Sequence, residues 1–498
     1  MNGTSWLPVA VLLSSLVPGI LIFFLPEGSR GSRTTLNLLG AGLKLGLVVI
    51  LLLGVAAGGS YEARFPLLEG LDLHLHADPL SLLFVTLSAL LWLVTTVYAI
   101  GYLEDSPNRG RFFGFFSLCV TATTGVALAG NLITFVIFYE MLTLTTYPLM
   151  VHRGTAEAIR AGRVYLAYTL SSGALLLLGV VWLRSLVGPI EFTQGGFLID
   201  AASAHRGTFT GLFFLFLAGF GVKAALFPLH GWLPKAMVAP APVSALLHAV
   251  AVVKAGAFGI VRLMYDVYGI EFCRDLGVNG PVVFLAAFTI LYGSLLALRQ
   301  QDLKKRLAYS TISQLSYIAL GAALAGPLAA VGGFVHLVHQ GTMKITLFFC
   351  AGNLAETLGI HSVKDLDGVG RRMPWTMGAF TLGCLGMIGV PPTAGFVTKW
   401  FLGTGAVAAH SPWVIGVLVG STALNAAYFL PLIHAAWFRV PRGDWHDEGR
   451  SGPFETRPAL LFPTLITAAL ALGFGLFAGM PFSPLDWAQF IVSGEYVR

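Results

Sequence analysis

The chain has 498 residues, of which 56% are hydrophobic and only 11% are charged, and its mean hydropathy is +0.78. Soluble proteins carry about 25% charged residues, so this composition excludes an ordinary soluble protein and predicts a polytopic membrane protein. The net charge of +6 does not indicate a nucleic-acid partner, because the basic residues lie in short loops between apolar segments and form no patch with interleaved aromatic residues.

The chain is predicted to be an all-α membrane protein with about 14 transmembrane helices. Each apolar segment is about 20 residues long, the length that crosses a hydrocarbon core of about 30 Å. In chain order, the predicted spans are 5–25, 36–57, 79–101, 111–130, 131–151, 162–186, 209–229, 241–264, 280–299, 307–325, 328–353, 376–403, 411–438 and 458–480. No Lys or Arg precedes the first span and no small-residue cleavage site follows it, so it is predicted to be a retained helix and not a signal peptide.

The charges of the loops predict how the chain is oriented in the membrane. Eighteen Lys and Arg residues, from Arg30 to Arg457, lie in loops that follow odd-numbered spans. The opposite side holds only four, which are Arg64, Arg206, Arg274 and Arg498. By the positive-inside rule, the odd loops are cytoplasmic and both termini are outside the cytoplasm. The expected location is the inner (plasma) membrane of the cell, with multiple spans.

Five ionisable residues lie inside the apolar spans: Glu140, Lys223, Lys254, Lys344 and Lys399. Such a residue at the centre of a span costs roughly 2.5 to 3.5 kcal/mol. Ionisable groups on successive helices therefore predict a relay for protons or small cations.

Other polar residues of the spans receive a structural interpretation. Lys44 has no motif around it and is interpreted as structural or as a residue at the lipid edge. Arg184 and Arg262 lie near the ends of spans, where long side chains reach the interface. The four cysteines occur singly and are interpreted as packing residues, not as ligands of a metal or cluster: Cys119, Cys273, Cys350 and Cys384.

Two spans are interrupted by proline next to a lysine. Pro228 follows Lys223 in the seventh span, and Pro391 and Pro392 precede Lys399 in the twelfth. Proline removes a backbone donor, and unwound backbone at this depth is tolerated only against protein or a water-filled cavity. A pair of such interruptions in the two halves of a membrane protein indicates inverted repeats with an ion site between them. The alternative is a simple proline kink in each span.

The pair of Glu140 and Lys223 is interpreted as a proton switch. If their helices pack together, the lysine favours the ionised carboxylate, and movement of the lysine away favours the protonated form. The alternative is a static buried ion pair, because breaking such a pair is costly whatever its purpose.

Three histidines complete the set of candidate proton carriers. His248 precedes Lys254 by six residues, and His336 and His339 share a helix face ahead of Lys344. Imidazole takes up and releases protons near neutral pH. A metal site is the weaker interpretation, because no carboxylate or thiol completes a ligand set in the same span. A hydrogen bond in helix packing is the alternative for each histidine.

Four motifs resemble the antiporter-like subunits, a family that comprises proton-pumping membrane subunits of respiratory complex I and the A-type and D-type subunits of Mrp cation/proton antiporters. The match covers roughly residues 75 to 435, which is most of the chain. Its motifs are FYEMLTLTTYPLMVH around Glu140, the segment 221–256 around Lys223, HLVHQGTMKITLFFCAG from His336, and GVPPTAGFVTKW ending at Trp400.

The resemblance implies a fold with two inverted five-helix repeats and broken seventh and twelfth helices. It divides a single membrane domain, 1–498, into N-terminal helices at 1–110, a first repeat at 111–264, a second repeat at 280–438 and a C-terminal helix at 458–480. It also implies roles. The Glu/Lys pair falls on Glu140 and Lys223, and the exit residue on Lys399.

Between these ends, the resemblance places the central groups on Lys254 and His248 and those of the eleventh helix on His336 and Lys344. Gln340 occupies a position that is often a second histidine, with His339 next to it. The chain ends without the long lateral helix of the largest complex I member, which favours the D-type Mrp subunit.

The predicted function is a proton-translocating subunit of a multisubunit Na⁺ or K⁺/H⁺ antiporter. The alternatives are a proton-pumping subunit of complex I or of a membrane-bound hydrogenase, and a membrane subunit that energises a soluble partner in inorganic-carbon uptake. The expected partners are other membrane subunits, protons, Na⁺ or K⁺ and the lipid bilayer. The chain has no nucleotide-binding motif and no cluster ligands, so we expect no cofactor, no metal and no catalytic residue of its own, and any enzymatic activity would belong to the complex.

Overall fold

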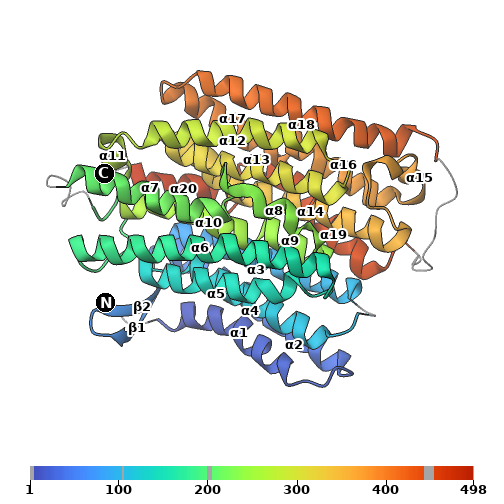
Figure 1. The fold of residues 1–498 in the computed structure, drawn as a ribbon, viewed down its shortest axis with the longest axis horizontal. Helices are drawn as coiled ribbons and strands as arrows, with labels where there is room; N and C mark the ends of the chain where they lie inside the picture. The colour runs from blue at the N-terminus through green and yellow to red at the C-terminus, as the bar shows by residue number, and fades with distance from the viewer. Residues whose placement is uncertain (1–4, 104–105, 199–204, 442–453, 497–498) are drawn as a thin grey trace.

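The computed structural model describes residues 5–103, 106–198, 205–441 and 454–496. The helices lie side by side in one bundle, with most of their axes along the long direction of the molecule (Figure 1). Three of the basic residues used to predict the orientation, Arg442, Arg450 and Arg498, lie outside the described residues.

Every predicted span falls on helical structure. Eleven predicted spans are single helices: α1 (Leu7–Phe23), α2 (Arg30–Ala56), α3 (Pro79–Tyr102), α4 (Arg109–Ala127), α5 (Leu132–Met150), α6 (Ala156–Val187), α12 (Asn279–Arg299), α13 (Leu303–Ala323), α14 (Pro327–Leu358), α18 (Trp413–Phe438) and α19 (Pro458–Leu476). Three spans are interrupted. The seventh ends early as α7 (Arg206–Lys223), the eighth is divided into α9 (Ala241–Ala249) and α10 (Val252–Arg262) with the π-helix η4 (Leu263–Val267), and the twelfth is divided into α16 (Pro374–Ile388) and α17 (Ala394–Ala408). Eight described segments are long and apolar enough to cross a membrane by length and composition alone.

Shorter elements that the sequence analysis did not predict connect the long helices. They are β1 (Glu62–Leu68), β2 (Leu71–His76), α8 (Trp232–Lys235), α11 (Ile270–Asp275), α15 (Val369–Arg372), α20 (Pro484–Tyr496) and the 3₁₀ turns Leu229–Gly231, Ala236–Val238 and Val363–Asp365.

Polar side chains in the loops set where several helices begin. Asp78 accepts a hydrogen bond from Ser81 N (2.7 Å) at the start of α3, and Asn131 accepts one from Thr134 N (2.8 Å) at the start of α5. Asp302 does the same for α13. Each cap satisfies a backbone donor that the first turn of a helix leaves free. The predicted boundary between the fourth and fifth spans is therefore confirmed, with α4 ending at Ala127 and α5 beginning at Leu132.

A β-hairpin covers one end of the bundle. Strands β1 and β2 pair in antiparallel fashion, with Glu62 opposite His76 and a turn at Gly70, whose φ of +67° suits glycine. His74 in β2 bonds Glu62 (3.2 Å) and also Glu191 (2.9 Å), which follows α6. The hairpin thus ties the α2–α3 connection to the loop after α6.

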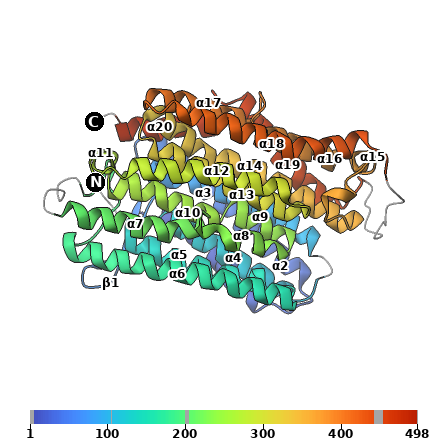
Figure 2. The same cartoon turned by 45° about the horizontal axis from the view of Figure 1, so that its top comes forward.

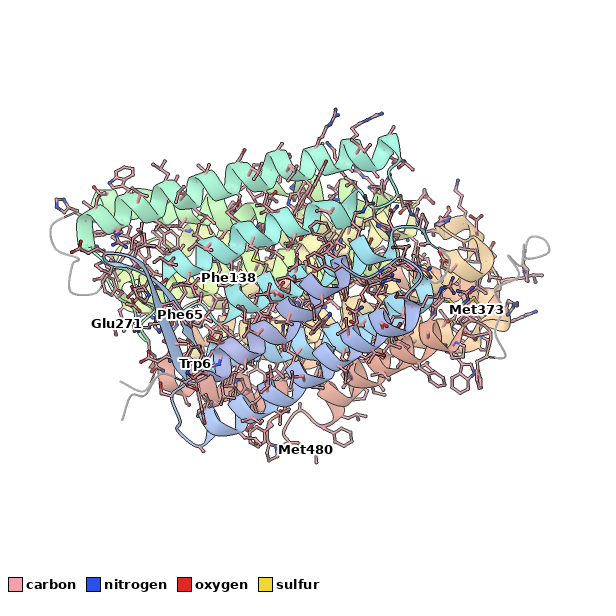
Figure 3. All side chains as sticks on the ribbon, turned by 90° about the horizontal axis from the view of Figure 1, so that it is seen from below. Trp6, Phe65, Phe138, Glu271, Met373 and Met480 are labelled. Atoms are coloured by element: carbon pink, nitrogen blue, oxygen red, sulfur yellow. The ribbon has the colours of Figure 1, made fainter. Side chains whose placement is uncertain are left out.

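Both chain ends lie at this same end of the bundle (Figures 1 and 2). Trp6 packs against Phe65 of the hairpin, with ring centroids 6.0 Å apart, and Trp487 of α20 donates to Pro79 O (2.8 Å). Figure 3 shows Trp6, Phe65 and Glu271 at one end of the molecule and Met373 at the other. An even number of crossings places the two termini on one side.

The structure corrects two interpretations of buried cations. Arg262 does not reach the membrane surface, because it is 2% exposed and pairs with Asp78 (2.7 Å) and Asp266 (2.8 Å). Lys44 does not lie at the lipid edge, since it is fully buried between helices. Asp78 at the start of α3 and Asp266 of η4 pair with Arg262, and Thr124 of α4 accepts a hydrogen bond from Lys44. All four cysteines are buried and free, as predicted.

The Glu191 carboxylate is expected to stabilise the hairpin only above acidic pH. Burial alone would raise the pKa of Glu191, but its hydrogen bond to His74 and the nearby positive charge of Arg64 hold that pKa below its ordinary value. A lowered pKa contributes stability above about pH 4 that is lost as the pH falls through the folded-state value. Glu191→Gln should therefore lower the melting temperature of the detergent-solubilised protein by about 1 to 3 °C at pH 7 and by less at pH 3.

Glu69→Gln is the matched control, because Glu69 lies exposed in the hairpin turn. An equal loss for Glu191→Gln at both pH values would contradict the electrostatic explanation.

Candidate functional site

The seventh span breaks at the residue where α7 ends. Ala225 has a φ of +57°, and Pro228 cannot donate a backbone hydrogen bond, so the helix does not continue. Trp232 Nε1 donates to Val222 O (2.7 Å), which satisfies one carbonyl that the break leaves open. The Lys223 ammonium group donates to Tyr139 O (2.5 Å) and lies 3.4 Å from the centroid of the Tyr139 ring. The predicted break is confirmed, and its lysine reaches across to α5.

Glu140 lies next to this contact but does not close an ion pair. Both Glu140 and Lys223 are described, and no ion pair of 4.0 Å or less joins them. The Glu140 carboxyl group packs against α6 at Gly173, where a Cβ atom would lie 2.3 Å from it. Its Oε1 atom is buried without a hydrogen-bond partner in the protein, although the residue as a whole is only half-buried. The geometry is thus that of an open pair, not of the static ion pair.

The twelfth span breaks between α16 and α17. Gly389 ends α16 with a φ of +89°, a conformation that favours glycine, and Pro391 and Pro392 follow. Lys399 Nζ donates to Ile388 O (2.5 Å), which the break leaves without a helical partner, and to Thr422 Oγ1 (2.8 Å) on α18. Lys399 is half-buried. Both breaks therefore lie beside a lysine that donates to a backbone carbonyl, of α5 at the first break and of the broken helix itself at the second.

A third interruption, which the sequence analysis did not predict, lies between His248 and Lys254. The helix opens at Val250 and Ala251, where Ala251 N bonds Leu246 O, five residues back (2.9 Å). Widened turns of this kind occur often at functional sites. No proline or glycine marks the position in the sequence.

Both polar side chains beside this interruption are completely buried. His248 packs on Phe348 of α14, with ring centroids 4.6 Å apart, and neither of its ring nitrogens has a protein partner. Lys254 Nζ also has none. Gly256 of α10 packs directly on the backbone of Lys223 and Ala224, so α10 touches the break of α7.

The eleventh span is the continuous helix α14, which carries three predicted site residues. His336 Nδ1 and His339 Nδ1 lie 3.3 Å and 3.1 Å from Thr398 Oγ1, the neighbour of Lys399. Lys344 Nζ instead donates to Leu307 O (3.1 Å) on α13. The two histidines therefore face the twelfth span, whereas Lys344 faces the tenth.

We call the eight predicted site residues, which lie on five of the predicted spans, the axis: Glu140, Lys223, His248, Lys254, His336, His339, Lys344 and Lys399. The six inner residues are 0 or 1% exposed, and only the two outer ones, Glu140 and Lys399, are half-buried. The helices of the two outer residues, α5 and α17, lie on opposite sides of the bundle in Figure 2, with α6 beside α5 and α18 beside α17.

Buried polar atoms without a protein hydrogen-bond partner gather along the axis. Besides those already named, they include Gln314 Nε2, Tyr317 Oη, both polar side-chain atoms of Gln340, His336 Nε2 and His339 Nε2. An unpaired buried polar group costs about 1 to 3 kcal/mol, and internal water commonly satisfies such groups. The arrangement is therefore suited to a chain of water molecules with titratable side chains at intervals.

Sequence reasoning missed Thr398, Tyr139, Gln314 and Tyr317. Thr398 is adjacent to Lys399 within the motif at the second break, and Tyr139 is adjacent to Glu140. Gln314 and Tyr317 are three residues apart on one face of an apolar span, a weak signal that was available. Within the described part of the chain, no group of three or more His, Cys, Asp or Glu residues could hold a metal ion.

Two families match the chain. Residues 129–425 match the family described as NADH:quinone oxidoreductase/Mrp antiporter, TM, and residues 70–113 match the complex I chain 5 N-terminus family. The first match covers more than half of the sequence and contains the whole axis.

Curated relatives of the chain include both subunits of NADH-quinone oxidoreductase and subunits of cation/proton antiporters. The N subunit of NADH-quinone oxidoreductase from Desulforudis audaxviator is 34% identical over 84% of this chain and 83% of its own length. The D subunit of the Na⁺/H⁺ antiporter from Bacillus subtilis is 28% identical over 81% of this chain and 80% of its own length. The A/B subunit of the probable K⁺/H⁺ antiporter from Rhizobium meliloti is 32% identical over 84% of this chain, which spans 42% of that longer protein.

The fold is also similar to that of a chain in the Mrp complex from Dietzia sp. DQ12-45-1b. The TM-score is 0.86, the sequence identity is 23%, and the match covers 100% of this chain and 98% of the other. At this identity the likeness shows the fold alone.

Gly256 is expected to be required for the close packing at the first break. A Cβ at this position would lie 2.2 Å from Ala224 N, so Gly256→Ala forces the backbone of the break to move. Overpacking of this kind costs about 1 to 3 kcal/mol, and we expect a lower melting temperature by tryptophan fluorescence in detergent. Gly378→Ala, in α16, is the control, because nothing lies within 4 Å of its Cβ position. Equal melting temperatures for the two variants would contradict the packing argument.

Proposed function

Because this chain belongs to the NADH:quinone oxidoreductase/Mrp antiporter family of membrane subunits, we propose that it translocates protons within a multisubunit monovalent cation/proton antiporter. The axis carries the protons, and the cation is handled by other subunits. The residues proposed to exchange protons are Glu140, Lys223, His248, Lys254, His336, His339, Lys344 and Lys399.

The observation that supports this proposal is the set of buried titratable groups with unpartnered polar atoms among them. A stable bundle has no need of Lys254 or His248 at completely buried positions without hydrogen bonds. Water molecules at these atoms would both satisfy them and conduct protons from one group to the next. A role in carrying protons thus explains why the protein buries these polar groups despite the free-energy cost of leaving them without hydrogen bonds.

The half-buried ends of the axis support a lateral pathway. The helices α5 and α17 lie on opposite sides of the bundle in Figure 2. Their residues Glu140 and Lys399 are each partly accessible, whereas the groups on the other helices are enclosed. Neighbouring membrane subunits at these two sides would deliver a proton or a change of charge to one end and receive it at the other. The partners implied are therefore membrane subunits of the same complex.

The first candidate is a D-type antiporter subunit, because the D subunit of the Na⁺/H⁺ antiporter is 28% identical over 81% of this chain. The second candidate is a proton-pumping subunit of an NADH:quinone oxidoreductase, which the 34% identity to an N subunit favours. The same axis would serve both functions, and the partner subunits would differ.

The orientation and the repeats belong to the same proposal. The end of the bundle that carries Arg33, Arg109 and Arg371 is the cytoplasmic one by the positive-inside rule, and both termini are then outside the cytoplasm. Residues 111–264 and 280–438 are the two inverted repeats, and each contains a helix that breaks beside a lysine, Lys223 or Lys399.

Glu140→Gln is expected to abolish proton-coupled transport and to leave assembly intact. Glutamine keeps the shape and hydrogen-bonding capacity of the carboxyl group but cannot exchange a proton, and losing one proton-transfer group costs about 100-fold or more in rate. The measurement is dissipation of a pH gradient in inverted vesicles that contain the whole complex. Glu157→Gln, at an exposed position on α6, is the control. Normal transport by Glu140→Gln would assign Glu140 a structural role.

Substitutions of Lys399 separate proton exchange from fixed charge. Arginine is effectively always protonated, so Lys399→Arg should block transport about as fully as Lys399→Ala in the same assay. Lys399→Glu restores a titratable group and should retain part of the activity. Near-normal transport by Lys399→Arg would show that this position needs only positive charge, and the exit role would then be withdrawn.

A further inference from the structure

A second set of buried polar side chains lies between α1, α2, α3 and α4, apart from the axis. Its innermost charged side chain is Lys44 of α2, which is 0% exposed. Lys44 Nζ donates to Thr124 Oγ1 on α4 and lies 5.3 Å from the centroid of the Trp92 ring on α3. The three helices packed against α2 contain no Asp or Glu, so this lysine has no counter-ion from them.

The titratable groups that these helices do carry are engaged elsewhere. Tyr98 donates to Phe349 O, Tyr102 lies 3.5 Å from Arg153, Arg109 pairs with Glu27, Arg111 donates to His152 O, and Cys119 contacts Thr146. Lys44 is therefore an isolated titratable group in this part of the bundle.

A row of buried polar side chains, several of them joined by hydrogen bonds, leads from the end of the bundle that carries Arg33 to Lys44. Arg33 donates to Glu27 O (2.9 Å) in the α1–α2 loop, and its own carbonyl accepts from Asn37 Nδ2 (3.0 Å). Asn37 Oδ1 accepts from Ser117 Oγ on α4 (3.2 Å). These hydrogen-bonded groups extend from the α1–α2 loop into the space between α2 and α4.

The row continues along one face of α4. Thr121 follows Ser117 by one turn and donates to Ser15 Oγ on α1 (2.9 Å). Thr124, the next residue on that face, accepts from Lys44. We call Arg33, Asn37, Ser117, Thr121, Ser15, Thr124 and Lys44 the polar file. Each of its seven side chains is at most 3% exposed.

The polar file reaches about halfway across the membrane. Arg33 and Lys44 are eleven residues apart on α2, which is about 16 Å along a helix at 1.5 Å per residue, about half of a core of about 30 Å. Beyond Lys44, the buried face of α2 is apolar and consists of Val48, Leu51 and Val55. The file therefore opens toward one side only.

Unpartnered atoms on α3 indicate that water belongs beside Lys44. Ser88 Oγ, Trp92 Nε1 and Thr96 Oγ1 are buried without a protein partner. Their spacing of four residues puts them on one face of α3, the face from which Trp92 contacts Lys44. Water at these positions would satisfy the three atoms and solvate the lysine, which offsets the cost of burying an amine without a counter-ion.

We propose that the polar file is a hydrated half-channel through which Lys44 exchanges protons with the water at the end that carries Arg33. A proton of hydronium moves to the lone pair of Nζ and leaves water, and the reverse step returns it. Thr124 donates its own proton to Val120 O (2.8 Å), so its oxygen accepts from Lys44 in both protonation states. The Trp92 face stabilises the charged form.

Lys44 is also connected through packed side chains to Glu140, which forms the first pair of the axis with Lys223. Thr124 is followed by Gly125, whose missing side chain lets the ring of Phe138 pack onto α4; a Cβ there would lie 2.2 Å from that ring. Phe138 immediately precedes Tyr139 and Glu140. This link to Glu140 rests on the proposed function, whereas the half-channel itself does not.

Cysteine accessibility tests the half-channel independently of transport. Thr121→Cys is placed in a variant whose four native cysteines are alanine, and a water-soluble methanethiosulfonate reagent is added to membranes that contain the whole complex. Hydration should make Cys at 121 react about tenfold or more faster than Cys at 122, because Ala122 is equally buried but lies off the polar file. Equal, slow reaction of the two variants would overturn the half-channel, even if transport is normal.

Replacing Lys44 tests the proton exchange. Lys44→Met keeps length and removes the titratable group, and we expect transport to fall severalfold, about as far as in Lys44→Arg, with unchanged assembly. If Lys44 only fills space, Lys44→Met would transport normally, and this result would overturn the proton role. Equal transport by the wild type and by Glu140→Gln would contradict the proposed function. The reactivity of Cys at position 121 would still test whether the half-channel is hydrated.

Discussion

A lipid bilayer offers no hydrogen-bond partners, and this constraint governs where polar groups lie in the protein. Each interruption of a helix leaves carbonyl groups that must find donors inside the bundle. Lys399 donates to Ile388 O at the end of α16, and Trp232 donates to Val222 O near the end of α7. Lys223 and Lys344 donate to carbonyl groups within the continuous helices α5 and α13. The lysines proposed to carry protons thus also join neighbouring segments of the bundle. A change in one lysine's protonation would weaken a contact that holds two segments together, which joins proton transfer to local structure.

Close helix packing gives this arrangement its rigidity. Gly256 lets α10 touch the break of α7, and Gly321 and Gly333 let α13 and α14 approach each other. Small residues at such contacts are typical of membrane proteins, since lipid tails provide no hydrophobic drive between helices. Around the rigid contacts, His248, Lys254 and Gln340 keep polar atoms without protein partners. The bundle therefore combines dense packing at the backbone with unsatisfied side chains along the axis, as a hydrated pathway requires.

The family resemblance explains the fold better than it explains the biological role. Relatives named for NADH:quinone oxidoreduction and for cation/proton antiport match the chain with similar identity. The residues that distinguish the two uses would lie on surfaces that face partner subunits. Function at the level of the complex is therefore a property of the assembly, whereas the axis is a property of this chain.

The sequence by itself determined the membrane class, the helical spans and the breaks beside Lys223 and Lys399, because hydrophobic length and proline act locally. It did not reveal the interruption at Val250–Ala251, which no proline or glycine marks, nor the hairpin anchored by His74 and Glu191. Only the tertiary structure showed that Thr398 joins His336 to His339, and that Arg262 and Lys44 are buried against partners from other helices. These contacts join residues far apart in the chain, and no local pattern of residues encodes which helix faces which.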